Sequence, residues 1–176
     1  MKNVVLIGYR CTGKTEVGRI VARDLGYNFI DTDVLVEKEA GATITQIVSR
    51  HGWTKFRALE KKAIARVSKL SDAVIATGGG AVLDEENVAN LRRNGIVFFL
   101  DAAPEVIFAR MKNDEKTDTQ RPKLTDKDAL SEIKALVTER AERYANAADY
   151  RIDTSDIAAD KVAENVLVMH KRRRAR

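Results

Sequence analysis

Cysteine and proline are scarce in this sequence of 176 residues. The single cysteine, Cys11, cannot form a disulfide within the chain, which argues against a disulfide-stapled domain and suits a reducing compartment. Two prolines are too few to suggest a linker between domains. No stretch approaches the roughly 18 apolar residues of a membrane-spanning helix, and the apolar run at 4–7 is too short for a secretory signal. We therefore expect one cytoplasmic domain, 1–176, without a membrane partner.

Acidic residues are outnumbered by basic ones, 26 against 31, which gives a formal net charge of +5 at pH 7. Such a surplus suits anionic small substrates as well as nucleic acid. The basic run at 171–176 has no interleaved aromatic residues. It is more typical of a solvated helix end, whose cations suit the helix dipole, than of a nucleic-acid site. We expect a monomer with no nucleic-acid partner.

Short apolar runs alternate with segments of helical spacing, and no fixed-period repeat occurs. The runs predict strands at 4–7, 28–30, 73–76, 96–100 and 150–153. Helical spacing predicts helices at 15–25, 34–40, 43–50, 56–67, 128–147 and from 158, with others after Asp84 and Pro104. Strands that alternate with helices imply a parallel sheet, which binds ligands beyond the carboxyl ends of its strands.

A phosphate-binding motif, G-x-x-x-x-G-K-[ST], follows the first apolar run and opens a helical pattern. It reads Gly8-Tyr9-Arg10-Cys11-Thr12-Gly13-Lys14-Thr15. The glycines let backbone N–H groups point at phosphate oxygens, and the helix N-terminus adds partial positive charge. Lys14 can reach the β- and γ-phosphates, and the Thr15 hydroxyl can ligate Mg²⁺. We expect ATP to be bound by Gly8, Arg10, Cys11 (through its backbone), Thr12, Gly13, Lys14 and Thr15.

Two carboxylates, Asp31 and Asp33, follow the predicted strand at 28–30. If the chain is still extended there, residues two apart face the same way and both overhang the ligand crevice. Phosphoryl transfer needs one carboxylate near the metal and one that orients the attacking hydroxyl. The alternative is that one aspartate caps the next helix, which hardly explains both.

Arg140 stands where an apolar side chain is expected. In the predicted helix at 128–147 it falls on the stripe of Ile133, Val137 and Tyr144. Burying a guanidinium without an anion is costly, so an anionic ligand at the helix edge would explain it. A structural ion pair, or a stem that reaches water, explains the pattern equally well.

Other candidates are weaker on pattern alone. Arg57 and Glu60, one helical turn apart, are typical of a surface pair of little energetic value. Trp53 and Phe56 are more typical of a core, although Trp53 could line a pocket. The three adjacent glycines at 78–80 are costly in conformational entropy, so we expect a ligand to approach the backbone there.

Two further arginines lie within or just before a polar segment at 112–127 that lacks periodicity. Arg121 lies within it and could close over the phosphates, or it could be a solvated loop cation. Arg110 precedes it and could stack on an adenine.

Taken together, the motifs resemble those of shikimate kinases. The resemblance runs over nearly the whole chain, to about residue 154, and the ordered set is more specific than the phosphate-binding motif alone. The telling pieces are Asp31-Thr32-Asp33, Gly52-Trp53, Phe56-Arg57, Glu60, Thr77-Gly78-Gly79-Gly80-Ala81-Val82, Arg121-Pro122, Arg140-Ala141 and Tyr144.

The resemblance implies transfer of the ATP γ-phosphate to the 3-hydroxyl of shikimate, on the route to chorismate and the aromatic amino acids. We predict a three-layer α/β P-loop NTPase fold whose five-stranded parallel sheet has the order 2-3-1-4-5. A substrate-binding segment at about 34–60 and a lid at about 112–124 complete it. The lid has Lys123 where an apolar residue is expected, and Asp101, after an apolar strand, is interpreted as a turn residue.

The resemblance also assigns roles. The catalytic residues would be Lys14, Asp33 and the lid arginine Arg121, with Asp33 orienting or deprotonating the hydroxyl. Shikimate would be held by Asp33, Arg57, Gly78, Gly79, Gly80 and Arg140. Mg²⁺ would be held by Thr15 and Asp31. Arg110, Arg121 and the segment after Asp153 would border the nucleotide.

Three alternatives remain open. Another small P-loop kinase, for a nucleoside monophosphate or gluconate, would need a different acceptor pocket. A GTPase-type switch is disfavoured because no Asn-Lys-x-Asp signature occurs. A nucleic-acid-binding module would rely on the tail at 171–176, and its binding would depend strongly on salt.

Overall fold

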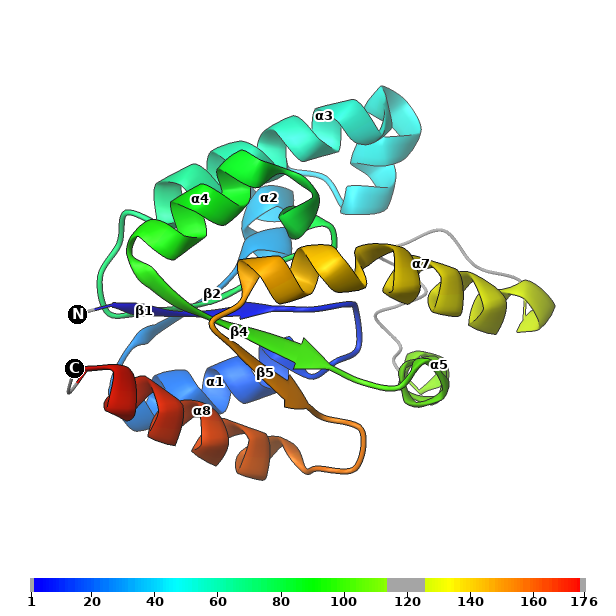
Figure 1. Cartoon of the computed structure of the whole chain (residues 1–176). Helices are drawn as coiled ribbons and strands as arrows, with labels where there is room; N and C mark the ends of the chain where they lie inside the picture. Colours follow the sequence, from blue (N-terminus) through cyan, green and yellow to red (C-terminus); the bar gives the residue numbers. More distant parts are fainter. Residues whose placement is uncertain (1, 114–125, 175–176) are drawn as a thin grey trace.

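A five-stranded parallel sheet forms the centre of the structure, a computed structural model that describes residues 2–113 and 126–174 (Figure 1). Its strands are β1 (Asn3–Ile7), β2 (Asn28–Asp31), β3 (Ala73–Ala76), β4 (Gly95–Asp101) and β5 (Tyr150–Asp153). Their order, β2-β3-β1-β4-β5, confirms the predicted order 2-3-1-4-5. The most buried strand, β1, pairs with β3 on one side and β4 on the other, so the phosphate-binding motif begins at the middle of the sheet.

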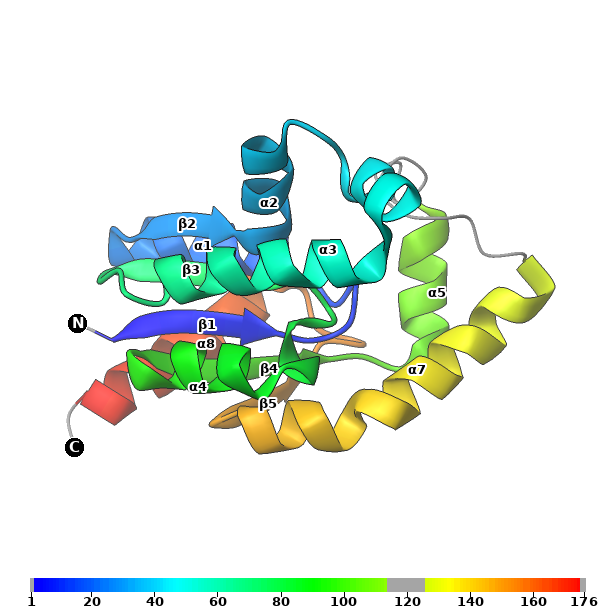
Figure 2. The same cartoon turned by 90° about the horizontal axis from the view of Figure 1, so that it is seen from above.

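Helices cover both faces of the sheet and complete the three layers (Figures 1 and 2). They are α1 (Lys14–Leu25), α2 (Thr32–Ala40), α3 (Ile44–Val67), α4 (Glu85–Arg93), α5 (Pro104–Lys112), α7 (Asp126–Ala147) and α8 (Ala159–Arg174), with a 3₁₀ turn η1 (Ala81–Leu83). Helices α1 and α8 pack on one face, whereas α3, α4 and the end of α7 pack on the other.

Alternating residues of β1 feed the two cores. Val4 and Leu6 pack with α1 and α8, whereas Val5 and Ile7 pack with α3, α4 and α7. All four are fully buried. A strand buried on both faces reads as a continuous apolar run, which is why the sequence predicted β1 and β4 well.

Helix ends follow the capping signals in the sequence. Thr43 and Gln46 form a capping box at the start of α3, and Asp84 caps α4. Gly41 ends α2 in the left-handed conformation. Gly52, with φ of 76°, breaks α3 into two parts, so the predicted helices at 43–50 and 56–67 are joined by a kink.

Gly18 lies where α1 meets the sheet. A Cβ atom there would stand 2.5 Å from Cε2 of Phe29 and 3.2 Å from Cδ1 of Leu6. We expect Gly18→Ala to lower the free energy of unfolding by about 1–2 kcal/mol, because overpacking outweighs the gain in helix propensity. Urea denaturation measures this, and a more stable variant would contradict the packing described.

Part of the predicted lid falls outside the described residues. Lys112 ends α5, but 114–124, and with them Arg121, lie in the undescribed segment. Within 2–113 and 126–174, no helix combines the length and apolar character needed to cross a membrane.

Candidate active site

The phosphate-binding loop joins β1 to α1 in a conformation that its glycines make possible. Gly8 has φ of 143°, and a Cβ atom there would collide with the carbonyl oxygen of Leu100. Gly13, at the start of α1, has φ of 90°. Thr12 is fully buried, and its hydroxyl donates to the Tyr9 carbonyl at 2.9 Å. The loop is therefore fixed by its own contacts.

Lys14 reaches back over this loop. Its Nζ donates to the carbonyl oxygens of Gly8 at 2.9 Å and Tyr9 at 2.5 Å. The amine is thus held at the mouth of the loop, beside the N-terminus of α1, where an anion is favoured by both the charge and the helix dipole.

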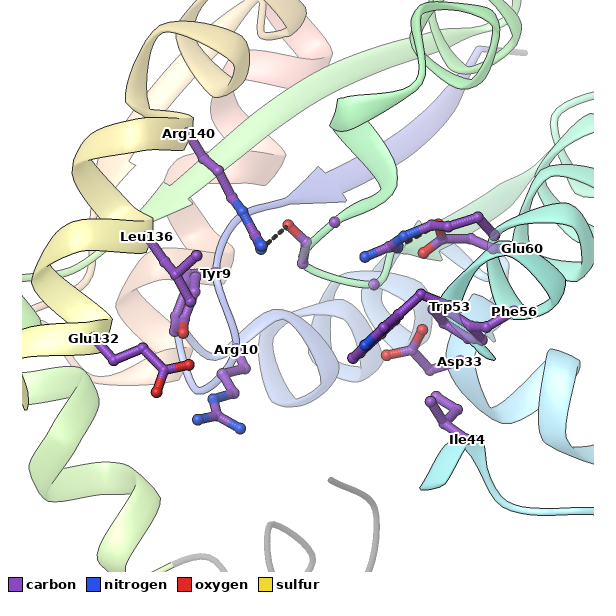
Figure 3. Close-up of a pocket in the computed structure, with 14 residues that line it drawn as sticks. Tyr9, Arg10, Asp33, Ile44, Trp53, Phe56, Glu60, Glu132, Leu136 and Arg140 are labelled. Atoms are coloured by element: carbon purple, nitrogen blue, oxygen red, sulfur yellow. Dashed lines mark hydrogen bonds and ion pairs between the residues drawn. The ribbon is translucent and has the colours of Figure 1, made fainter. Parts of the chain in front are cut away.

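Two cavities open on either side of the loop. The first, the α1–α8 pocket, has a volume of about 540 Å³ and is lined by Cys11, Thr12, Gly13, Glu16, Val17, Arg110, Thr154, Ile157, Ala158, Ala159 and Val162. The second, the α3–α7 pocket, has a volume of about 320 Å³ and is lined by Tyr9, Arg10, Asp33, Ile44, Trp53, Phe56, Arg57, Glu60, Gly78, Gly79, Gly80, Glu132, Leu136 and Arg140 (Figure 3).

Arg110 fixes one wall of the α1–α8 pocket. Its guanidinium donates to the carbonyl oxygen of Thr154 at 2.6 Å and to the carbonyl oxygen of Cys11 at 3.3 Å. It therefore ties α5 to the phosphate-binding loop and to the turn after β5. In that turn, the hydroxyl and backbone N–H of Ser155 donate to Asp153, and these bonds hold the pKa of the Asp153 carboxyl below its usual range.

Asp31 has two roles. Its Oδ1 caps α2 by accepting from the backbone N–H groups of Asp33 and Val34, and its Oδ2 accepts from the Thr15 hydroxyl at 3.0 Å. The extended chain ends at Asp31, because α2 begins at Thr32. Strand alternation is therefore the wrong reason to pair Asp31 with Asp33, since Asp33 reaches the α3–α7 pocket from the first turn of a helix.

Arg57 and Glu60 form a partly buried ion pair rather than the surface pair that their spacing suggested. Nη1 of Arg57 lies 2.6 Å from Oε2 of Glu60, whose side chain is only 1% exposed. The guanidinium also lies over two rings, with Cζ 5.1 Å from the centroid of Phe56 and 5.6 Å from that of Trp53. Arg57 is thus held in one orientation with part of its guanidinium facing the pocket.

Trp53 is not a core residue. It is 51% exposed and lines the pocket, whereas Phe56, also at the pocket wall, is buried. The two rings meet edge to face, with centroids 5.9 Å apart. Of this pair, the core expectation is correct for Phe56 and wrong for Trp53.

Two of the three glycines, Gly78 and Gly80, leave room for charged side chains. A Cβ atom on Gly78 would stand 2.5 Å from Oδ1 of Asp33 and 2.8 Å from Oε1 of Glu60. A Cβ atom on Gly80 would stand 2.6 Å from Cζ of Arg57. None of the three has a positive φ. Gly78 and Gly80 are therefore needed because site side chains, rather than a ligand alone, pack against this backbone, whereas a Cβ atom on Gly79 would lie 3.4 Å or more from backbone atoms of the phosphate-binding loop.

Arg140 approaches the glycines from α7 (Figure 3). Its Nη1 is 3.5 Å from the carbonyl oxygen of Gly79, which also accepts from the Tyr144 hydroxyl. Its Nε is buried and has no hydrogen-bond partner among the described residues. A buried donor without a partner is costly, and an anion in the pocket would remove that cost.

The sequence prediction and the structure differ on the pocket that Arg10 lines. The sequence patterns also missed four residues that line the α3–α7 pocket. The sequence places Arg10 with the nucleotide, whereas its side chain lines the α3–α7 pocket. The residues missed are Tyr9, Ile44, Glu132 and Leu136. Glu132 and Leu136 precede Arg140 by eight and four residues, so the helical face of Arg140 could have identified them.

Comparison with known proteins decides the family. A sequence model of shikimate kinase matches residues 10–171. The shikimate kinase of Caldanaerobacter subterraneus subsp. tengcongensis is 48% identical over 95% of each chain, and that of Caldicellulosiruptor saccharolyticus is 46% identical over 97% of this chain and 96% of its own.

The chain belongs to the shikimate kinase family. Its reaction is the ATP-dependent phosphorylation of the 3-hydroxyl of shikimate, a step in the biosynthesis of chorismate and the aromatic amino acids. Solved structures of shikimate kinases share the fold. That from Acinetobacter baumannii, in complex with shikimate, gives a TM-score of 0.92 at 31% identity and covers 100% of this chain and 96% of its own. That from Aquifex aeolicus gives 0.80 at 31% identity and covers 98% of each chain.

Proposed function

We propose that shikimate binds in the α3–α7 pocket, that ATP binds along the α1–α8 pocket, and that the phosphoryl group passes between them at the phosphate-binding loop. The observation that carries this proposal is the convergence of Arg57, Arg140 and Asp33 on one cavity whose wall is that same loop. Two cations and one carboxylate suit an acceptor that has a carboxylate and a hydroxyl.

The carboxylate of shikimate is held between Arg57 and Arg140. Guanidinium groups bind carboxylates through short, charge-assisted and often bidentate hydrogen bonds. Glu60 and the aromatic rings already fix Arg57, and Gly79 positions Arg140. Little side-chain entropy is therefore lost on binding.

Asp33 faces the acceptor hydroxyl. A carboxylate there orients the hydroxyl or removes its proton as the oxygen attacks the γ-phosphorus and the bond to ADP breaks. Lys14 balances the charge on the transferring phosphoryl group. We also propose Arg121 for this second role, on the strength of the family resemblance alone.

The adenine lies in the α1–α8 pocket beside Arg110. The hydrogen bonds from Arg110 to Thr154 and Cys11 hold its planar guanidinium at the pocket wall, where a base can stack on it. The turn after Asp153 lines the same cavity.

The residues around Thr15 fit a magnesium ion. A hydroxyl and a carboxylate, on Thr15 and Asp31, lie 3.0 Å apart beside the loop, and Mg²⁺ prefers oxygen ligands from one or two such side chains completed by phosphates and water. No cluster of three acidic, histidine or cysteine ligands occurs among the described residues, and this type of site does not need one. When bound, Mg²⁺ would neutralise charge on the nucleotide phosphates.

Removing either guanidinium tests the acceptor site. We expect Arg57→Met and Arg140→Met each to raise KM for shikimate by about 30-fold or more, because each removes a charge-assisted bond worth about 2–3 kcal/mol. KM for ATP should change little. Steady-state kinetics with Arg93→Met as a control, an exposed arginine on α4 outside both pockets, measures this. An unchanged KM for shikimate in both variants would show that the carboxylate of shikimate does not bind between Arg57 and Arg140.

Acceptor choice separates shikimate from other acids. ADP release should be rapid with shikimate and close to the no-acceptor rate with gluconate or nucleoside monophosphates, because only a cyclic carboxylate suits a pocket walled by Trp53, Phe56 and Leu136. Rapid turnover of gluconate would contradict this.

We further propose a single-domain, cytoplasmic monomer, with residues 34–60 as the acceptor-binding segment and 112–124 as the lid. The observation that supports the acceptor-binding segment is that five residues from 44 to 60 line the acceptor side. No nucleic-acid role is proposed for the tail, in which Arg173 pairs with Asp149. Light scattering after size exclusion gives the oligomeric state.

A further inference from the structure

Between Arg10 and Cys11 the phosphate-binding loop passes from the wall of the α3–α7 pocket to the wall of the α1–α8 pocket. Cys11 has φ of 58°, a left-handed conformation that residues other than glycine seldom adopt. Residues before this point, Tyr9 and Arg10, line the α3–α7 pocket, whereas Cys11, Thr12 and Gly13 line the α1–α8 pocket. The loop therefore contributes one cation, Arg10, to the acceptor side.

Tyr9 spaces Arg10 from Arg140. The Cζ atoms of these arginines lie 5.9 Å and 6.0 Å from the centroid of the Tyr9 ring, which is buried. Because the ring is fixed, the two cations occupy defined places on one wall of the pocket. Arg140 faces the glycines, and Arg10 lies at the loop (Figure 3).

The position of Arg10 suits a group that the acceptor gains during the reaction. The proposed partners of the shikimate carboxylate are Arg57 and Arg140, so the carboxylate does not need Arg10. After transfer, the acceptor also carries a phosphate, on an oxygen that faced the loop. Among the residues that line the α3–α7 pocket, Arg10 is the cation that belongs to the phosphate-binding loop. It therefore lies at the end of the pocket where the new phosphate is formed.

Glu132 introduces an opposing charge. It lies on α7 two turns before Arg140, lines the same pocket, and extends on the Arg10 side of Tyr9 and Leu136 (Figure 3). No hydrogen bond or ion pair joins it to another residue in the described part of the chain. A carboxylate at this place repels a phosphate dianion more than it repels neutral hydroxyls.

We infer that Arg10 forms a phosphate subsite for the product within the α3–α7 pocket and that Glu132 weakens retention of the product there. The inference rests on the proposed acceptor site. It follows that Arg10 and Glu132 change the affinity for the product, shikimate 3-phosphate, and have little effect on the affinity for the substrate, shikimate.

Calorimetric titration of the folded enzyme with shikimate 3-phosphate, shikimate and ADP tests the inference. Arg10→Met should weaken binding of shikimate 3-phosphate by about tenfold or more, as expected for loss of a charge-assisted hydrogen bond, and should change shikimate binding less than about threefold. Glu132→Gln should tighten binding of shikimate 3-phosphate by about two- to fivefold, a small effect because Glu132 is exposed and screened.

Matched controls carry the same charge change elsewhere. Arg93→Met on α4 and Glu142→Gln on α7 are exposed and line neither pocket, so neither should alter the ratio of the two affinities. If Arg10→Met weakens ADP instead, the arginine serves the nucleotide and the inference fails. It also fails if shikimate and its phosphate weaken equally, or if Glu142→Gln reproduces the effect of Glu132→Gln.

One further variant separates this inference from the acceptor assignment. Arg140→Met should weaken shikimate and shikimate 3-phosphate together. If Arg140→Met leaves both unchanged, the acceptor assignment fails whatever Arg10 does. If Arg140→Met weakens both and Arg10→Met weakens neither, only the phosphate subsite is wrong.

Discussion

Asp33→Asn should reduce turnover by about three orders of magnitude while ADP binding stays unchanged. The amide keeps the shape of the side chain but loses the negative charge that orients or deprotonates the acceptor hydroxyl, and such a group contributes about 10²–10⁴ in rate. Asp33 lines the α3–α7 pocket and none of the α1–α8 pocket, so nucleotide affinity is not expected to change. Turnover comes from a coupled ADP-release assay, and ADP affinity from calorimetry.

Asp24→Asn is a suitable control for this measurement. Asp24 pairs with Arg23 at the solvated end of α1 and lines neither pocket, so its loss should leave turnover unchanged. Near-normal turnover in Asp33→Asn would remove Asp33 from the mechanism.

Gly80→Ala should raise KM for shikimate by about two orders of magnitude. A methyl group at Gly80 would stand 2.6 Å from Cζ and 2.7 Å from Nη1 of Arg57, so the guanidinium must move. Its displacement breaks the 2.6 Å contact with buried Glu60 and takes Arg57 away from the carboxylate. Disrupting one partner of a buried charge pair typically costs 2–5 kcal/mol. Steady-state kinetics measures the resulting rise in KM for shikimate.

Gly79→Ala adds the same methyl group one residue earlier. There its nearest neighbours lie 3.4 Å to 3.6 Å away, which is close to ordinary contact. The loss of shikimate affinity should therefore be much smaller than in Gly80→Ala, with thermal melting used to check that both variants fold. Equal losses in the two variants would show that the position of Arg57 is not the reason for the glycine.

The fold could be predicted largely from the sequence because its signals are local. Strands such as β4, buried on both faces, read as unbroken apolar runs, and caps such as Asp84 and Gly41 mark helix ends. The chain order of the strands in the sheet, in contrast, came from the family resemblance. Asp101, interpreted as a turn residue, instead ends β4 and pairs with Arg151.

The candidate site was harder to predict because burial depends on the fold. Spacing alone cannot tell an exposed i,i+3 pair from one such as Arg57 and Glu60, where packing against the glycines buries the carboxylate. Trp53 was misjudged for the same reason, since an aromatic residue beside a kink can point outward. Which of the two pockets the Arg10 side chain lines depends on the left-handed conformation of Cys11, and no sequence pattern indicated that conformation.

A crystal structure with shikimate and ADP bound tests the central claim most directly. The structure predicts the carboxylate within hydrogen-bond distance of both Arg57 and Arg140, with the 3-hydroxyl turned toward Lys14 and next to Asp33. A carboxylate that contacts neither arginine, or a shikimate molecule bound outside the α3–α7 pocket, would contradict it.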